Sequence, residues 1–148
     1  MSVLKLSVIV PCFNEAANLP ELVRRIGETF VVGGFLPRGD SAGEAAPHMP
    51  SPPDAQAVAG AALQAELILV DDGSSDDSPA RMAELAARYP FVRPLRHEQN
   101  QGIAAAWRSG AQAARGELVC IIDADLQYQP EDILRLHREL LWSNCDIV

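Results

Sequence analysis

Basic residues are scarce in this sequence. Its 12 Lys and Arg stand against 20 Asp and Glu, which gives a formal net charge of −8. Such a chain repels polyanions and offers no broad basic surface, so nucleic acid is excluded as an expected partner. A small phosphorylated ligand stays compatible with this charge, because a bound divalent cation reverses the local sign of an acidic site.

Cysteines and long apolar runs are scarce as well. Cys12, Cys120 and Cys145 are widely spaced, with no Cys-x-x-Cys pair and no His cluster, so we expect reduced core thiols rather than a zinc site. No segment approaches the roughly 20 apolar residues of a membrane-spanning helix, and the apolar start at residues 1–10 is too short for a signal peptide. We expect a soluble, cytoplasmic chain, with peripheral membrane contact left open.

What the sequence does contain is a set of short apolar runs. Residues 6–10, 67–70 and 118–122 are rich in β-branched side chains and each run stops at Pro or Asp, as is typical of buried parallel strands. A fourth short strand is expected at 91–95. Helical patterns lie between the runs, and this alternation predicts one α/β domain with helices on both faces of a mostly parallel sheet.

Four helices are expected, over about residues 18–30, 78–88, 103–114 and 130–141. The third has a face of small residues that favours close packing on the sheet, and Gly116 is its expected C-cap. The fourth is expected to bury Ile133, His137, Leu140 and Leu141. Residues 33–62 are crowded with Gly, Pro, Ala and Ser without apolar period, which predicts a flexible surface insertion within a single domain of residues 1–148.

Polar residues follow the apolar runs, where ligands bind in parallel α/β sheets. The carboxyl ends of parallel strands meet at one edge, so we expect these side chains to share one rim. After the first run come Pro11, Asn14 and Glu15, after the second Asp71 and Asp72, and after the run at 118–122 Asp123, Asp125 and Gln127.

Asp123 and Asp125 carry the sharpest signal. Two carboxylates two residues apart at a strand end can converge on one hard cation, and Mg²⁺ or Mn²⁺ suits oxygen ligands. Such an ion would bridge diphosphate oxygens and stabilise a departing nucleoside diphosphate. Gln127 could add a carbonyl oxygen or orient a metal-bound water. The competing interpretation is a helix cap or turn, as in most isolated Asp-x-Asp triplets, but the neighbouring acidic strand ends favour the metal site.

The other rim residues suit a nucleotide. Asp71 and Asp72 could accept hydrogen bonds from a base N–H and from ribose hydroxyls, although a capping turn explains Asp71 equally well. Glu15 could reach the nucleotide, whereas Asn14 is also explained as a turn residue. Gly102 precedes a helix, where backbone amides can approach phosphates. We expect Arg24, Arg25, Arg108, Arg135 and Arg138 to be solvated, His97 and His137 to be structural, and Trp107 to lie in the core.

Three segments together resemble the family-2 glycosyltransferases of GT-A (Rossmann-like) fold: LSVIVPCFNE at residues 6–15, VDDGSSD at 70–76 and DADLQ at 123–127. The order and spacing match over nearly the whole chain except residues 33–62. The residues around the last motif look most like the branch with dolichyl-phosphate mannose synthase and bacterial polyprenyl-phosphate glycosyltransferases. They are Asn100, Gln101 and Gly102 before the motif and Pro130 and Glu131 after it.

The resemblance implies that Pro11, Glu15 and Asp72 line a nucleoside pocket. It implies that Asp123, Asp125 and Gln127 surround Mg²⁺ or Mn²⁺ and the diphosphate, with Asp125 catalytic. The implied reaction moves a sugar, with inversion, from a UDP- or GDP-sugar to an acceptor, most consistent with a polyprenyl (dolichyl or undecaprenyl) phosphate at the cytoplasmic membrane face.

Two departures from the family pattern stand out. Ile103 replaces the Lys that the branch often has after Asn-x-Gly, and the sequence stops at Val148, where family members continue into an acceptor-binding region. The resemblance therefore implies a donor-binding part, and a non-catalytic nucleotide-sugar-binding fragment is one alternative. A haloacid-dehalogenase-like phosphatase also sets Asp-x-Asp after a strand, but Leu126 and the late position of Asp123 argue against it.

Overall fold

The computed structural model describes residues 5–37, 63–143 and 145–148. Within them, every expected strand and helix is present, with boundaries shifted by a few residues. In chain order the elements are β1 (Leu6–Cys12), α1 (Leu19–Val32), β2 (Ala65–Asp72), α2 (Ser78–Arg88), β3 (Val92–His97), α3 (Ile103–Ala113), β4 (Leu118–Ile121) and α4 (Asp132–Ser143).

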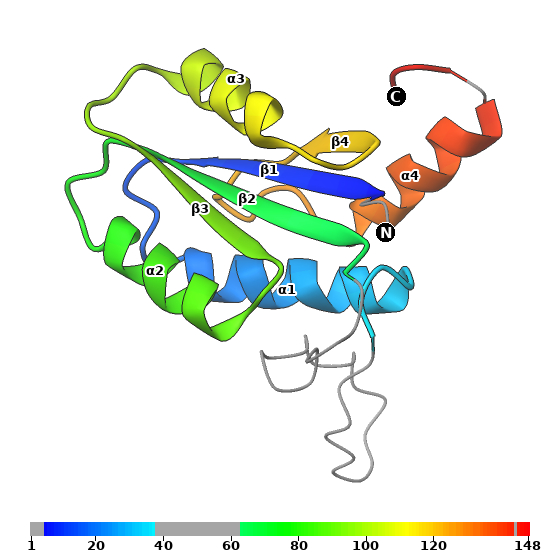
Figure 1. Cartoon of the computed structure of the whole chain (residues 1–148), viewed down its shortest axis with the longest axis horizontal. Coiled ribbons are helices and arrows are strands. Elements are labelled where there is room, and N and C mark those ends of the chain that lie inside the picture. Colours follow the sequence, from blue (N-terminus) through cyan, green and yellow to red (C-terminus); the bar gives the residue numbers. More distant parts are fainter. Residues whose placement is uncertain (1–4, 38–62, 144) are drawn as a thin grey trace, which may run out of the picture.

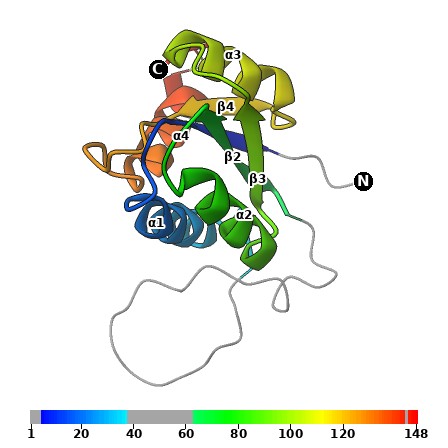
Figure 2. The ribbon, with the colours of Figure 1, turned by 90° about the vertical axis from the view of Figure 1, so that its left-hand side faces the viewer.

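The described strands form one parallel sheet in the order β3-β2-β1-β4. Helices α1 and α2 lie on one face of this sheet and α3 lies on the other (Figures 1 and 2). Because strands β1, β2 and β4 run in the same direction, their carboxyl ends meet at one rim. The predicted α/β arrangement is confirmed.

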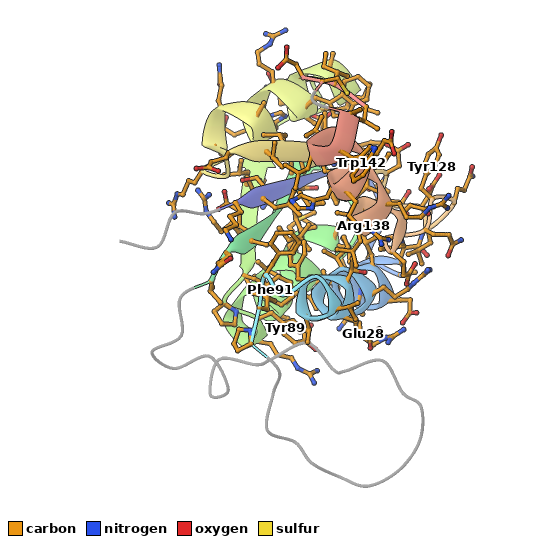
Figure 3. All side chains as sticks on the ribbon, turned by 90° about the vertical axis from the view of Figure 1, so that its right-hand side faces the viewer. Glu28, Tyr89, Phe91, Tyr128, Arg138 and Trp142 are labelled. Carbon is orange, nitrogen blue, oxygen red and sulfur yellow. The ribbon has the colours of Figure 1, made fainter. Side chains whose placement is uncertain are left out.

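The core divides into two layers, because successive side chains of a strand point to opposite faces. Val8, Val10 and Leu67 belong to the large layer beneath α1 and α2, where the rings of Tyr89 and Phe91 also meet with centroids 5.6 Å apart (Figure 3). The layer beneath α3 is small: Ile9, Ile68, Val70 and Ala106. A Cβ atom at Gly110 would collide with the Ile9 side chain, so the small face of α3 does allow close packing on the sheet.

Strand β4 is an edge strand of the described sheet, and it is less buried than its apolar run suggests. Val119 is 49% exposed and Ile121 is 46% exposed. Both lie on the α3 side of the sheet, since their partners in β1 are Ser7 and Ile9. Helix α3 packs mainly over β1 and β2, so this face of β4 is only partly covered. A run of apolar residues predicts a hydrophobic strand, but it does not predict which neighbouring helix or strand covers each face.

Helix α4 also differs from expectation. Ile133 is buried, but His137 and Leu140 are only half-buried and Leu141 is 63% exposed. The same outward part of the helix carries Trp142, 89% exposed (Figure 3). The apolar residues of α4 therefore extend around the helix beyond the stripe that packs on the described core.

Other local expectations need correction. Helix α3 ends at Ala113 with Ala114 as its C-cap, and Gly116 instead lies against the Ser7 backbone, where a Cβ would collide. Of the cysteines only Cys12 is buried; Cys120 is intermediate and Cys145 exposed, and all three are free. Trp107 is 39% exposed rather than a core residue.

The predicted insertion begins inside the core. Phe35 and Leu36 are buried, and the Phe35 ring packs edge-on against Phe30 and against His137, with centroids 6.3 Å and 5.1 Å away. Residues 38–62 lie outside the described part, so the flexible-insertion hypothesis stays a prediction for them. Among the described residues no helix is both long enough and apolar enough to cross a membrane.

Replacement of Gly110 by Ala tests the close approach of α3 to the sheet. We expect Gly110→Ala to lower the free energy of unfolding by about 1–3 kcal/mol, because the added methyl group overpacks against Ile9. The control Gln112→Ala changes an exposed position of the same helix and should stay within about 0.5 kcal/mol of the wild type. Urea denaturation followed by circular dichroism measures both, and equal stabilities would contradict the packing.

Candidate nucleotide and metal site

The sheet brings the acidic strand ends together. One pocket of about 230 Å³ at the carboxyl rim contains Pro11 and Glu15 from the β1 end, Asp72 from the β2 end, and Asp123 and Asp125 after β4. The predicted convergence of these side chains on one rim is confirmed. The remaining wall is mostly apolar: Cys12, Phe13, Ile103 and Ala124.

Asn14 lies outside the pocket wall and joins two loops. Its backbone has φ of 56°, its N–H donates to Ser74 Oγ at 2.9 Å, and its side-chain Oδ1 accepts from the Ser75 N–H at 2.9 Å. Ser78 helps in the same way by accepting from the Glu15 N–H at 2.9 Å. The structure therefore favours the turn interpretation of Asn14. Sequence reasoning missed the two serine hydroxyls that hold the β1 loop to the β2 loop.

Asp71 is 1% exposed and does not line the pocket. Its Oδ1 accepts from the Ser74 N–H at 3.1 Å, which is the turn that the sequence suggested. Its Oδ2 has no hydrogen-bond partner among the described residues, and the Arg96 Nε lies 3.4 Å away. Burial, and then the nearby charges of Asp71 and Glu15, raise the pKa of Cys12, so this thiol stays protonated beside the two carboxylates.

Asp72 is buried at the back of the pocket with both oxygens engaged. Oδ1 accepts from the Gln101 N–H at 2.9 Å and contacts His97 Nδ1 at 2.7 Å, and Oδ2 accepts from the Gly102 N–H at 2.8 Å. Burial alone would raise the pKa of Asp72, but these hydrogen bonds outweigh it and hold the pKa below its usual value. The Gly102 N–H, at a residue with φ of 90°, is thus engaged by Asp72, and phosphate binding at Gly102 stays a prediction.

His97 has the structural role that the sequence analysis expected, although its partners were not predicted. Its second ring nitrogen, Nε2, lies 2.8 Å from Ser109 Oγ, so the imidazole links Asp72 to helix α3. Asp72 and His97 are register partners on the parallel strands β2 and β3. An acid and a histidine at the ends of consecutive predicted strands were the signal that could have identified the pair.

Asp123 and Asp125 are the more open members of the pocket. Asp123 is half-buried and Asp125 is exposed. The Asp125 Oδ1 accepts from the Gln127 N–H at 3.0 Å, in a turn where Leu126 has φ of 62°. Gln127 is exposed and does not line the pocket, so within the described structure it contacts Asp125 through its backbone.

The carboxylate oxygens of Asp123 and Asp125 are ligands that suit a hard divalent cation. The described residues contain no group of three or more His, Cys, Asp or Glu placed to hold an ion. Two carboxylates are nevertheless what Mg²⁺ commonly takes from a protein when substrate phosphates and water complete its shell, and Mn²⁺ accepts the same hard ligands. Asp123 and Asp125 therefore suit a divalent ion that arrives with a phosphorylated ligand.

The pH dependence of stability tests the bonding of Asp72. Folding lowers the pKa of Asp72 below its ordinary value of 3.8. The ionised carboxylate therefore stabilises the protein fully at pH values above 3.8, and this stabilisation is lost as the pH falls through the lower pKa of the folded state. We expect Asp72→Asn to cost about 1–3 kcal/mol at neutral pH and to reduce the acid-induced loss.

The measurement is urea denaturation between about pH 7 and about pH 3. Glu98→Gln, at an exposed position, is the control and should match the wild type at neutral pH within about 0.5 kcal/mol. An Asp72→Asn curve parallel to that of the wild type through the acid range would contradict the assigned bonding.

Comparison with known proteins places this geometry in a family. An undecaprenyl-phosphate 4-deoxy-4-formamido-L-arabinose transferase of Klebsiella pneumoniae is 36% identical over 133 residues, covering 89% of this chain and 32% of the relative. A dolichol-phosphate mannosyltransferase of Pyrococcus furiosus is 32% identical, covering 90% of this chain and 29% of the relative. The chain thus spans about a third of the length of these curated relatives.

Solved structures show the same fold. The mannosyltransferase PcManGT from Pyrobaculum calidifontis, in complex with GDP-Man and Mn²⁺, superposes with a TM-score of 0.63 at 24% identity, covering 92% of this chain and 32% of that one. TarS 1-349 of S. aureus with UDP-GlcNAc gives 0.62 at 18% identity, covering 94% and 31%. The fold is therefore of the GT-A type. The family model "Glycosyl transferase family 2" matches residues 55–148, and this chain belongs to that family.

Proposed function

We propose that the chain is the donor-binding part of a glycosyltransferase that uses a nucleoside-diphosphate sugar. The observation that carries the proposal is the single pocket in which Asp72, Asp123 and Asp125 meet at the carboxyl rim of a parallel sheet. Support comes from the relatives, which are named as polyprenyl-phosphate sugar transferases, and from a neighbour that holds GDP-Man and Mn²⁺.

In this proposal Asp123 and Asp125 would hold Mg²⁺ or Mn²⁺ together with the diphosphate of the donor. When bound, the ion neutralises negative charge that develops on the departing nucleoside diphosphate. Asp125 is then the catalytic carboxylate, and the backbone N–H of Gln127 orients it through the 3.0 Å hydrogen bond. A direct metal contact from the Gln127 side chain stays a prediction.

The nucleoside occupies the β1 and β2 side of the same pocket. Pro11 and Phe13 supply apolar surface there, and Glu15 supplies an acceptor whose Oε2 is oriented by Asn18 Nδ2 at 2.7 Å. Asp72 shapes this wall by holding the amides of Gln101 and Gly102. The branched apolar side chain of Ile103 stands at the opening, 52% exposed, so the phosphates depend on the metal ion for positive charge at this point.

The acceptor in this proposal is a polyprenyl phosphate at the cytoplasmic membrane surface. Its phosphate oxygen forms a bond to the anomeric carbon while the bond to the nucleoside diphosphate breaks, so the configuration at that carbon inverts. A phosphate monoester is already ionised near neutral pH, and positioning together with charge neutralisation supplies the catalysis. The acceptor is supported by the relatives' names alone.

Donor binding without turnover is the alternative to sugar transfer. The chain spans only about a third of the relatives that it resembles. Donor binding and sugar transfer are therefore measured separately.

The test is calorimetric titration of GDP-mannose and UDP-sugars with and without Mn²⁺. We expect metal-dependent binding of one donor class, and we expect Asp123→Ala and Asp125→Asn each to weaken it by at least about tenfold. Asp77→Asn is the matched control, because Asp77 is exposed and its side chain caps nothing. Equal donor affinity in all variants, or donor affinity that does not depend on Mn²⁺, would contradict the assignment of Asp123 and Asp125 as metal ligands.

Transfer is then measured as release of nucleoside diphosphate on addition of a polyprenyl phosphate. Release that requires the lipid phosphate supports the transferase. Metal-dependent donor binding with no release supports the binding fragment instead.

A further inference from the structure

The segment between β4 and α4, residues 122–131, carries the acid pair and has few anchors. Ile122 is 7% exposed and Ala124 is 4% exposed, and both belong to the core beneath α1. Leu126 packs partly against the same core. The intervening Asp123 and Asp125 have almost no polar support, apart from the Gln127 N–H on Asp125.

Besides the backbone hydrogen bond from the Ile122 N–H to the Ile9 carbonyl at 3.0 Å, this segment has a polar side-chain anchor from helix α1. Arg25 Nε donates to Glu131 Oε1 at 3.0 Å and its Nη2 donates to Glu131 Oε2 at 2.6 Å. The same Nη2 donates to Gln129 Oε1 at 2.5 Å. A guanidinium that binds both oxygens of one carboxylate fixes its orientation as well as its distance. The expectation that Arg25 is a solvated charge was wrong.

Arg24 provides the contrast on the same helix. Its side chain is 44% exposed and, among the described residues, bonds Glu21 and Glu28, which lie one turn away in α1. The Arg25 side chain is 19% exposed and reaches a residue 106 positions later in the chain. Partial burial alone would raise the pKa of Glu131, but the hydrogen bond and charge of Arg25 reverse this and lower it. The pair is thus ionised and directional.

Three backbone hydrogen bonds continue the chain from this anchor into α4. The Asp132, Ile133 and Leu134 N–H groups donate to the carbonyls of Gln129, Pro130 and Glu131, at 3.0, 3.1 and 3.3 Å. Arg25 binds the side chains of two of these three residues, Gln129 and Glu131. The Arg25 hydrogen bonds therefore join the start of α4 and the end of the acidic segment to α1, beside the apolar packing of Ile133 and Leu134.

We propose that Arg25 is a positioning residue that clamps residues 122–131 to α1 and so holds Asp123 and Asp125 at the pocket. The clamp is present in the ligand-free chain. Its effect on metal binding rests on the proposed function. The alternative is an ion pair that adds to stability without setting the position of the segment.

The first experiment needs no ligand. Hydrogen exchange of the Asp132, Ile133 and Leu134 amides is followed residue by residue by NMR in Arg25→Gln and in the control Arg24→Gln. We expect exchange at these amides to be at least about threefold faster in Arg25→Gln and unchanged in Arg24→Gln, with core amides of β1 unaffected in both. Equal exchange in the two variants, or uniformly faster exchange across the whole chain in Arg25→Gln, overturns the clamp.

Graded and exchanged variants separate the clamp from general stability. Arg25→Lys keeps the charge but cannot donate from two fixed positions, so it should lie between Arg25→Gln and the wild type. The double variant Arg25→Glu with Glu131→Arg restores an opposite pair and should recover part of the protection that Glu131→Arg alone loses. No recovery in the exchanged pair counts against the clamp.

The second experiment measures Mn²⁺ affinity in the presence of the nucleoside diphosphate that the wild type binds, by electron paramagnetic resonance of free Mn²⁺. We expect Arg25→Gln to weaken the affinity by at least about threefold while Arg24→Gln does not, at closely similar melting temperatures. Unchanged affinity in Arg25→Gln overturns the link to the acid pair. If the wild type binds no Mn²⁺ with any nucleotide, the proposed function fails, and hydrogen exchange still decides the clamp.

Discussion

The parallel alignment of β1 with both β2 and β4 is the constraint on which the site depends. It delivers Glu15, Asp71, Asp72, Asp123 and Asp125 to one rim of a chain that already carries a net charge of −8. Like charges so close together repel, and the structure offsets this unevenly. Asp72 receives two backbone N–H groups and contacts His97, and Asp71 receives one N–H group with Arg96 nearby. The Asp123 carboxylate accepts no hydrogen bond from the described residues, and the Asp125 carboxylate accepts one, from the Gln127 N–H. Asp123 and Asp125 are therefore less compensated than Asp71 and Asp72, and a cation is favourable beside them.

The pocket is held from both faces of the sheet. On the α3 side, Asp72 and His97 fix the loop before α3 and the helix itself through Ser109. On the α1 side, Arg25 fixes the end of the acidic segment through Glu131. Each anchor joins elements that are far apart in sequence, so the geometry of the rim is a product of the complete sheet. Neither helix face alone would place the acid pair opposite the β1 loop.

The fold and the rim follow from the sequence because they depend on local patterns. Short β-branched runs that end at Pro11, Asp71 and Asp123 are enough to predict parallel strands, and parallel strands are enough to predict a shared rim. The partners of each carboxylate do not follow in this way. That Asp72 would accept a hydrogen bond from the Gly102 N–H depends on a backbone conformation with positive φ, which the residue pattern does not specify. Likewise the exposure of Ile121 depends on where α3 crosses the sheet, and Arg25 needs a partner 106 residues later.

The central claim is that the carboxylates of Asp123 and Asp125 share a divalent ion with a bound diphosphate. Anomalous X-ray diffraction from crystals of the chain grown with Mn²⁺ and UDP or GDP tests this most directly. The account predicts one manganese peak with oxygens of Asp123, of Asp125 and of the diphosphate all within about 2.0–2.6 Å. A diphosphate bound at the rim with manganese elsewhere, or with neither carboxylate turned toward it, would contradict the account.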